Sequence, residues 1–211
     1  MGLEVELKLA ADGDAPLREL ADADALGRAQ LGPPERFDEV DRYLDTPDRR
    51  FAAARWACRL RRRDGRTRIT LKGSAASGSG AGLHRRPEVE GPATDALDPA
   101  TWPASEARDF VDRLRAGGPL IERFRLVQQR TERSVAVDGD RIGTLTLDVV
   151  GVEADGTPRG TLHAVELELL TPTPRHQEVL DELAVELRAV AGLRPDRRTK
   201  LEHALALIGG R

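Results

Sequence analysis

The chain opens with charged and aliphatic residues in strict alternation, and this pattern constrains the fold more than any other feature. Side chains along a β-strand point alternately to opposite faces. A strand over residues 2–10 therefore places Glu4, Glu6 and Lys8 on one face and aliphatic side chains on the other. Taken alone, this segment fits an exposed amphipathic edge strand as well as a strand that lines a cavity for metal ions and phosphate.

The same division into a charged and an aliphatic face returns in later segments, which include residues 86–90, 141–150 and 163–169. A sheet that closes on itself would turn the charged faces into the lining of a polar channel and would leave no exposed edge. We therefore predict a closed barrel whose aliphatic faces pack outward under helices. Its lining would carry the carboxylates Glu4, Glu6, Glu88, Glu90, Asp148, Glu166 and Glu168 and the cations Lys8, Arg59, Arg61, Lys72 and Arg130.

A basic hairpin is predicted around Asp64-Gly65, a favoured two-residue turn. Pairing about this turn sets Arg63 opposite Arg66 and gives the hairpin one cationic face. Like charges opposite each other are destabilising, so this face needs carboxylates, phosphates or bulk water as a counterpart. We expect Arg63 and Arg66 to be solvated at the tip and the deeper cations to be ligand candidates. The cationic face comprises Arg59, Arg61, Arg63, Arg66, Arg68 and Lys72.

The remaining elements follow from periodicity and turn residues. Strands are expected over residues 40–45 and 124–137, the second being either two strands or one bent strand. Small residues predict a flexible loop over 74–82, a helical excursion spans 92–118, and a turn is expected over 153–160. Helices are expected over residues 17–26, 103–116 and 174–190, the last with Thr173 as its N-cap.

A capping box at Thr199-Lys200-Leu201-Glu202 predicts a final short helix. A lysine in the first turn of a helix opposes the helix dipole. Lys200 is therefore either an exposed lysine tolerated at small cost or a phosphate ligand at a helix start, where backbone N–H groups also favour anions.

The composition limits the classes of function. A chain of 211 residues fits a single domain, residues 1–211, and its net charge of −3 indicates neither a nucleic-acid nor a membrane surface. The lone Cys58 excludes an intrachain disulfide and a cysteine-based zinc site. Aromatic residues at 3% disfavour base stacking, so a sequence-specific nucleic-acid partner is not expected. The four histidines lack metal-ligand spacing and are expected to be structural or exposed. Without a long apolar run or a signal peptide, we expect no membrane partner and a cytoplasmic location.

Carboxylates and cations that line one channel suit phosphoryl chemistry. Mg²⁺ commonly takes one or two carboxylates together with water and substrate phosphates. Several arginines and lysines on the opposite side suit a small-molecule polyanion such as a triphosphate chain. The pattern thus favours a metal-assisted attack on a phosphoryl group.

The Glu-x-Glu-x-Lys motif at Glu4, Glu6 and Lys8 resembles the signature of the CYTH domain, also called the triphosphate tunnel metalloenzyme family. The resemblance covers nearly the whole chain in the family's order. It continues at Tyr43-Leu44-Asp45-Thr46, Arg59-Leu60-Arg61, Ile69-Thr70-Leu71-Lys72, Glu88-Val89-Glu90, Arg130 with Arg133, Asp148, Glu166-Leu167-Glu168 and Thr199-Lys200.

The resemblance implies an α+β fold, a closed antiparallel eight-stranded β-barrel, or tunnel, with flanking helices. It implies Mg²⁺ or Mn²⁺ as cofactor, and a catalytic set of Glu4, Glu6, Lys8 and Glu168. The implied metal ligands are Glu4, Glu6, Asp148, Glu166 and Glu168, and Glu88 and Glu90 complete the acidic side. The implied substrate-binding residues are Lys8, Arg59, Arg61, Lys72, Arg130, Arg133 and Lys200. One departure is Gln128, where a basic residue is common, which would weaken the grip on one phosphate.

Family members cleave inorganic triphosphate, thiamine triphosphate or RNA 5′-triphosphate ends, or cyclise ATP. For this chain the resemblance favours a metal-dependent hydrolase of inorganic triphosphate. A thiamine triphosphatase and an ATP-cyclising lyase remain alternatives, although the sequence reveals no adenine and ribose pocket. A non-catalytic polyphosphate or nucleotide binder is disfavoured because such a protein gains nothing from so many acids in its groove. The sequence also leaves a homodimer open.

Overall fold

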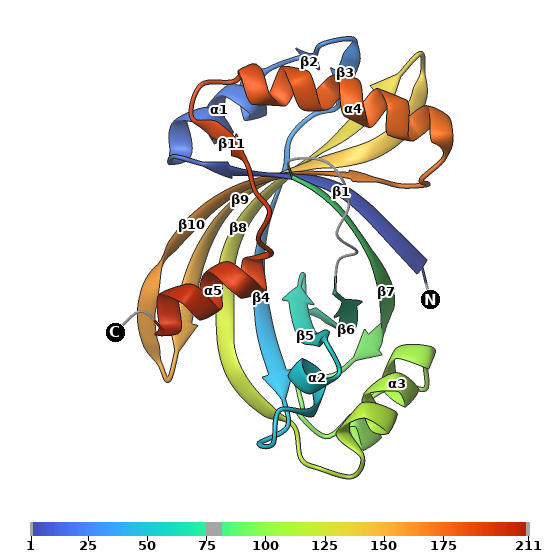
Figure 1. Cartoon of the computed structure of the whole chain (residues 1–211), viewed down its shortest axis with the longest axis vertical. Coiled ribbons are helices and arrows are strands. Elements are labelled where there is room, and N and C mark those ends of the chain that lie inside the picture. Colours follow the sequence, from blue (N-terminus) through green and yellow to red (C-terminus); the bar gives the residue numbers. More distant parts are fainter. Residues whose placement is uncertain (1, 75–81, 210–211) are drawn as a thin grey trace.

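The computed structural model describes residues 2–74 and 82–209, which form a closed β-barrel with helices around it (Figure 1). The strands follow the order β8-β4-β5-β6-β7-β1-β10-β9, and β9 pairs with β8 to close the ring. Every pairing in the ring is antiparallel. The predicted eight-stranded barrel is therefore confirmed. Its strands are β1 (Gly2–Ala11), β4 (Glu35–Asp45), β5 (Trp56–Arg63), β6 (Arg66–Gly73), β7 (Leu83–Ala93), β8 (Ile121–Val137), β9 (Asp140–Ala154) and β10 (Thr157–Leu169).

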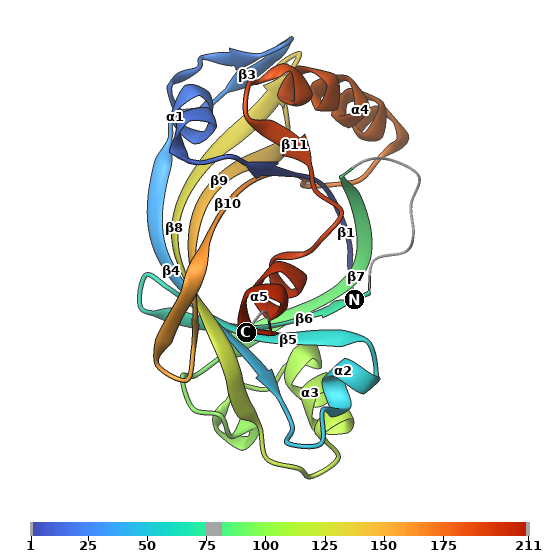
Figure 2. The ribbon, with the colours of Figure 1, turned by 60° about the vertical axis from the view of Figure 1, so that its left-hand side comes forward.

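Helices other than α5, together with three short strands, cover the outside of the ring. Figure 1 places α1 and α4 at one end of the molecule and α2 and α3 at the other. In Figure 2 the strands form a ring, and α5 lies across part of its opening. The helices are α1 (Asp14–Asp22), α2 (Arg50–Ala53), α3 (Glu106–Arg115), α4 (Pro174–Ala189) and α5 (Lys200–Gly209); the short strands are β2 (Ala25–Leu26), β3 (Ala29–Leu31) and β11 (Leu193–Pro195).

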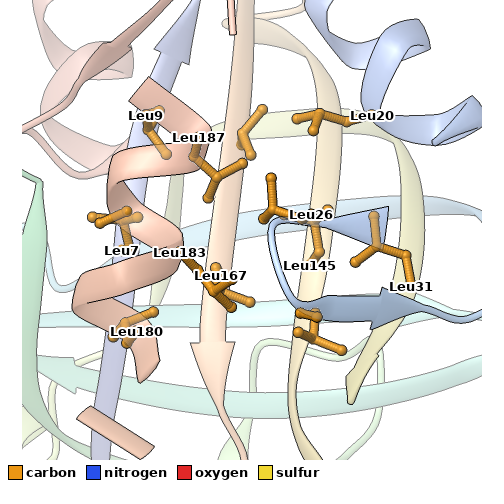
Figure 3. Packing of buried hydrophobic residues seen from close by; sticks show 14 of the residues in the cluster. Leu7, Leu9, Leu20, Leu26, Leu31, Leu145, Leu167, Leu180, Leu183 and Leu187 are labelled. Atoms are coloured by element: carbon orange, nitrogen blue, oxygen red, sulfur yellow. The ribbon is translucent and has the colours of Figure 1, made fainter. Parts of the chain in front are cut away.

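Of the hydrophobic cores in the described residues, two lie between the barrel wall and the helices, outside the ring, and a third packs α5 against residues of β8 and β9 that share the inward face of Arg130 and Asp148. Figure 3 shows Leu7 of β1 and Leu167 of β10 facing Leu180 and Leu183 of α4. Burying one such leucine is worth on the order of 1.5–3 kcal/mol. A second core packs β5, β6 and β7 against α2 and α3. Because the aliphatic faces of the strands are used outward, their charged faces must point into the barrel.

Several predicted elements are present with small changes. The hairpin register about Asp64-Gly65 is as expected, with Arg63 opposite Arg66, and both turn residues have the positive φ that a type I′ turn requires. Thr173 caps α4 through the His176 N–H. Thr199 and Glu202 form the capping box of α5.

Three predictions about elements need correction or completion. The helix predicted over 17–26 ends at Asp22, and Leu26 lies in β2, because that leucine reaches the same core after a tight turn at Gly27. Residues 124–137 belong to one strand, β8, which is bent by a register shift between Val135 and Ala136. The turn expected over 153–160 shrinks to Asp155-Gly156, and the flanking strands continue to it. Of the loop predicted over 74–82, residues 75–81 lie outside the described part of the chain.

The helical excursion expected over 92–118 contains a short 3-10 helix (Pro99–Thr101) and α3, which Ser105 caps through the Arg108 N–H. None of the helices in the described residues combines the length and the apolar character needed to cross a membrane.

Candidate active site in the barrel interior

The barrel encloses a cavity of about 1350 Å³ whose lining comes from the charged strand faces and the start of α5. Most of the predicted site residues meet there. Asp148 and Arg133 are the predicted residues that do not line it. The lining includes Glu4, Glu6, Lys8, Arg59, Arg61, Lys72, Glu88, Glu90, Arg130, Glu166, Glu168 and Lys200.

Three carboxylates gather on neighbouring strands in this cavity. Glu6 of β1 lies directly opposite Glu168 of β10. Glu4 lies two residues before Glu6 in β1 and therefore points to the same face. One carboxylate oxygen from each of the three residues lies within 4.8 Å of the other two. Glu4 and Glu6 are buried, whereas Glu168 is exposed to the open interior. Oxygen donors in this arrangement fit a hard divalent cation such as Mg²⁺ or Mn²⁺.

The environments of two of these carboxyls push their pKa values apart. Burial alone would raise the pKa of Glu4, but the charges of Lys72 and Arg86 outweigh it and lower this pKa to about 2. For Glu168, partial desolvation by the surrounding protein, together with the nearby Glu4 charge, raises the pKa to about 7. The lowered pKa keeps Glu4 firmly ionised, whereas the raised pKa lets Glu168 hold a proton more readily than Glu4 when no metal is bound.

Arg86 of β7 connects the acidic cluster to the cations and was missed in the sequence. Its Nε donates to Glu4 Oε2 at 2.6 Å, and its Nη2 donates to Glu6 Oε1 at 2.9 Å. Lys72 of β6 also donates to Glu4. Arg86 could have been found, because it lies two residues before Glu88 and so shares its strand face.

A second group of charges surrounds Glu166 of β10. Lys8 Nζ lies 3.0 Å from Glu166 Oε1, and Lys200 Nζ lies 3.0 Å from Glu166 Oε2. These two lysines outweigh burial and hold the pKa of Glu166 well below its usual value. Lys200 also donates to the fully buried Asp148 at 2.6 Å, and Arg130 forms a two-pronged pair with Asp148 at 2.7 and 2.9 Å. Asp148 and Glu166 therefore neutralise cations, and neither belongs to the three-carboxylate cluster.

Lys200 does not lie on the protein surface. It is the first residue of α5, its side chain is only 11% exposed, and it points into the cavity. Of the two interpretations of its place in the first helical turn, the exposed lysine is wrong. Its contacts with Asp148 and Glu166 offset the unfavourable dipole.

Two further acids, Asp41 and Glu39 of β4, lie beneath the basic hairpin and were also missed in the sequence. Asp41 is fully buried and accepts two hydrogen bonds from Arg61 at 2.7 and 2.8 Å, one from Arg59 at 3.2 Å and one from Gln128 at 2.8 Å. Burial would raise the pKa of Asp41, but Arg59 and Arg61 outweigh it and hold this pKa below its usual value. Gln128, which departs from the family pattern, thus supports the carboxylate that orients these arginines.

Two expectations about arginines are wrong. Arg63 is not solvated at the hairpin tip: its Nη1 donates to Glu132 at 2.7 Å, and its guanidinium lies over the Phe37 ring, 3.3 Å from the ring centroid. Arg133 does not reach the cavity. It is buried beneath the end of α1 and donates to the backbone carbonyls of Leu20, Ala21, Ala23, Leu31 and Gly32.

Comparison with known proteins agrees with this architecture. Residues 2–204 match the CYTH domain. No curated protein matches the chain. Among solved structures, HpAC1 from Hippeastrum, named for adenylyl cyclase and described as having a dominant triphosphatase activity, aligns with a TM-score of 0.68 and 21% identity, covering 99% of this chain and 96% of that one.

Two further structures share the fold. A protein from Pyrococcus horikoshii OT3 aligns with a TM-score of 0.59 and 22% identity over 99% of both chains. A Bacillus halodurans protein assigned as an adenylate cyclase aligns with a TM-score of 0.57 and 19% identity, covering 96% of this chain and 98% of that one. At these identities the likeness establishes the fold, while the match over residues 2–204 establishes the family. The chain belongs to the CYTH family.

Proposed function

We propose that the protein is a divalent-metal-dependent hydrolase of triphosphate substrates, with inorganic triphosphate as the first candidate. The observation that carries this proposal is the meeting of Glu4, Glu6 and Glu168 with a surrounding set of cations in one cavity. A cavity built only to bind a polyanion has no use for a cluster of carboxylates. The dominant triphosphatase activity described for the Hippeastrum protein favours hydrolysis over cyclisation.

Glu4, Glu6 and Glu168 would hold the metal, because their oxygens are hard donors and lie close enough together to share one ion. A divalent ion bound there supplies charge neutralisation and polarises water for attack on a phosphoryl group. Arg86 holds two of these carboxylates in place, since its guanidinium contacts both Glu4 and Glu6.

The cations of the opposite walls would hold the phosphates. Arg61 is fixed by Asp41 through two short hydrogen bonds, whereas Arg59 makes longer ones, at 3.2 Å to Asp41 and 3.4 Å to Thr70. The guanidinium of Arg59 is therefore freer to turn toward a bound phosphate. Lys8 and Lys200 flank Glu166 and offer ammonium groups on the other side.

The test of the overall proposal is an assay of phosphate release from inorganic triphosphate, thiamine triphosphate and ATP, with Mg²⁺ and then with Mn²⁺. Cyclic AMP formation from ATP is followed in parallel. Release that is fastest from inorganic triphosphate and depends on the metal supports the proposal. Cyclic AMP as the main product would replace it with the lyase, and binding without turnover of any substrate would replace it with a binding module.

Removal of single cations from the basic hairpin should weaken substrate binding. Arg59→Ala and Lys72→Ala are each expected to raise KM for inorganic triphosphate by roughly 10- to 100-fold, the equivalent of roughly 1.5–3 kcal/mol for a charge-assisted contact. We expect no gain in stability of the apo protein from either change, because Arg59 and Lys72 already pair with Asp41 and Glu4.

Arg66→Ala is the matched control, because Arg66 lies at the tip of the same hairpin and is exposed outside the cavity. Steady-state kinetics on the three variants provide the measurement. An unchanged KM in both Arg59→Ala and Lys72→Ala would contradict the assignment of this wall to phosphate binding.

A further inference from the structure

The segment that leads from β11 into α5 is fastened at Asp196. The backbone N–H of Asp196 donates to the Lys8 carbonyl at 2.9 Å, and its own carbonyl accepts from His84 Nε2 at 2.9 Å. Both carboxylate oxygens of Asp196 also accept hydrogen bonds. Oδ1 accepts from the Arg198 N–H at 2.9 Å, and Oδ2 accepts from His203 Nε2 at 2.6 Å.

These contacts join three elements around the cavity. Lys8 belongs to β1, which also carries Glu4 and Glu6. His84 belongs to β7, lies opposite Glu6 in the strand register and lines the cavity. His203 belongs to the first turn of α5 and follows Lys200 by three residues. Asp196 thus holds β1, which carries Glu4 and Glu6, and its neighbour β7 through its backbone, and the helix that carries Lys200 through its side chain.

The start of α5 is placed by these polar contacts, while the rest of the helix packs against apolar residues of the barrel. Among its described residues only Ala204 is buried, whereas α4 buries Val179, Leu180, Leu183, Ala184 and Leu187. The partly buried Leu201, Leu207 and Ile208 of α5 also pack against an apolar cluster, so packing holds the body of the helix while the Asp196 contacts fix its start. Lys200 stands at its first residue, so a small shift of the helix start would move Nζ away from Glu166 and Asp148.

We propose that Asp196 is a positioning residue of the site: it holds the start of α5 so that the Lys200 ammonium is placed to bind a phosphate group of the substrate. The inference rests on the proposed function, since it takes the cavity to bind a triphosphate. Asp196 itself does not touch the reacting atoms. It acts through Lys200, and this dependence separates a positioning role from a merely structural one.

A double-mutant cycle tests this dependence, using Asp196→Ala, Lys200→Met and the double variant. The measured quantities are kcat/KM for inorganic triphosphate at saturating Mg²⁺ and Kd for inorganic triphosphate by calorimetry. We expect Asp196→Ala to lower kcat/KM by roughly 10-fold and Lys200→Met by more, with the double variant no worse than Lys200→Met alone. Urea unfolding of each variant shows whether it is folded under assay conditions.

Two companion variants keep the test decisive. Asp196→Asn retains an acceptor for the Arg198 N–H and is expected to recover part of the lost kcat/KM, whichever way Asp196→Ala affects folding. Arg194→Ala is the control. Arg194 lies two residues before Asp196 and forms an exposed ion pair with Asp12, and the variant is expected to behave as wild type.

The outcomes separate this inference from the function on which it rests. Losses that add in the double variant, or an Asp196→Ala protein with wild-type kcat/KM, would overturn the positioning role alone. A wild-type protein that neither binds nor hydrolyses triphosphate would overturn the proposed function, and the positioning role with it.

Discussion

Replacing Glu168 by Gln is expected to abolish most metal-dependent hydrolysis while leaving the barrel folded. Glutamine keeps the size of the side chain but removes the charge that a divalent ion requires from its ligand. The loss should be roughly 100-fold or more, the effect of removing several kcal/mol of charge stabilisation from the transition state. Phosphate release from inorganic triphosphate at saturating Mg²⁺ and Mn²⁺ measures it. Unchanged turnover would remove Glu168 from the metal site.

The same substitution should alter the stability of the metal-free protein in a pH-dependent way. The pKa of Glu168 rises from 4.5 to about 7, chiefly through desolvation and then through the nearby Glu4 charge. A carboxyl with a raised pKa binds its proton more tightly in the folded state, so its contribution to stability falls as pH rises from about 4.5 to about 7. Metal-free Glu168→Gln should therefore melt higher than wild type at pH values above about 7, and this advantage should shrink in acid.

Melting temperatures in EDTA on both sides of this pH window provide the measurement. Glu178→Gln is the control. It removes one negative charge from an exposed glutamate of α4, outside the cavity. Adding Mg²⁺ should raise the melting temperature of wild type more than that of Glu168→Gln, because only the wild type keeps the complete carboxylate cluster. Equal shifts in the two proteins would contradict the assignment.

The sequence was enough to predict that the charged strand faces line the interior, because strand parity sorts each residue to one face. Parity alone could not predict which carboxylates meet. Glu6 lies opposite Glu168 because β10 is the neighbour of β1 in the ring, and that pairing depends on the topology of the whole chain. The same limit hid Asp41, whose importance appears only when β4 is paired with β5 and Asp41 falls opposite Arg61.

Arg133 shows how a family resemblance can conflict with elementary geometry. Arg130 and Arg133 lie three residues apart on one strand, β8, so they must point to opposite faces. Arg130 points into the cavity and Arg133 points outward beneath α1. Strand parity, applied strictly, would have separated the two arginines before the structure was known.

Removal of the Asp41 carboxylate should strongly destabilise the fold. Asp41→Ala would leave Arg59 without its carboxylate partner, Arg61 with Glu39 as its remaining one, and Gln128 without its acceptor. Breaking a buried ion pair by removing one partner costs roughly 3–5 kcal/mol. The free energy of unfolding from urea titration at neutral pH measures this loss. Asp38→Ala is the control, because Asp38 is an exposed aspartate of the same strand. It should change the free energy of unfolding by less than about 0.5 kcal/mol.

The dependence of this loss on pH gives an independent check. The pKa of Asp41 lies below its ordinary value of 3.8, because Arg59 and Arg61 outweigh burial. The ion pairs therefore stabilise the protein fully above about pH 3.8, and this contribution is lost as pH falls further toward the folded-state pKa. The stability gap between wild type and the variant should be constant from neutral pH down to about 4 and should narrow only in stronger acid. If Asp41→Ala does not fold, Asp41→Asn retains one acceptor oxygen and should show the same pH dependence with a smaller loss. A gap no larger than that of Asp38→Ala would mean that the arginines are held by the other cavity carboxylates, and Glu39 would then be the residue to test.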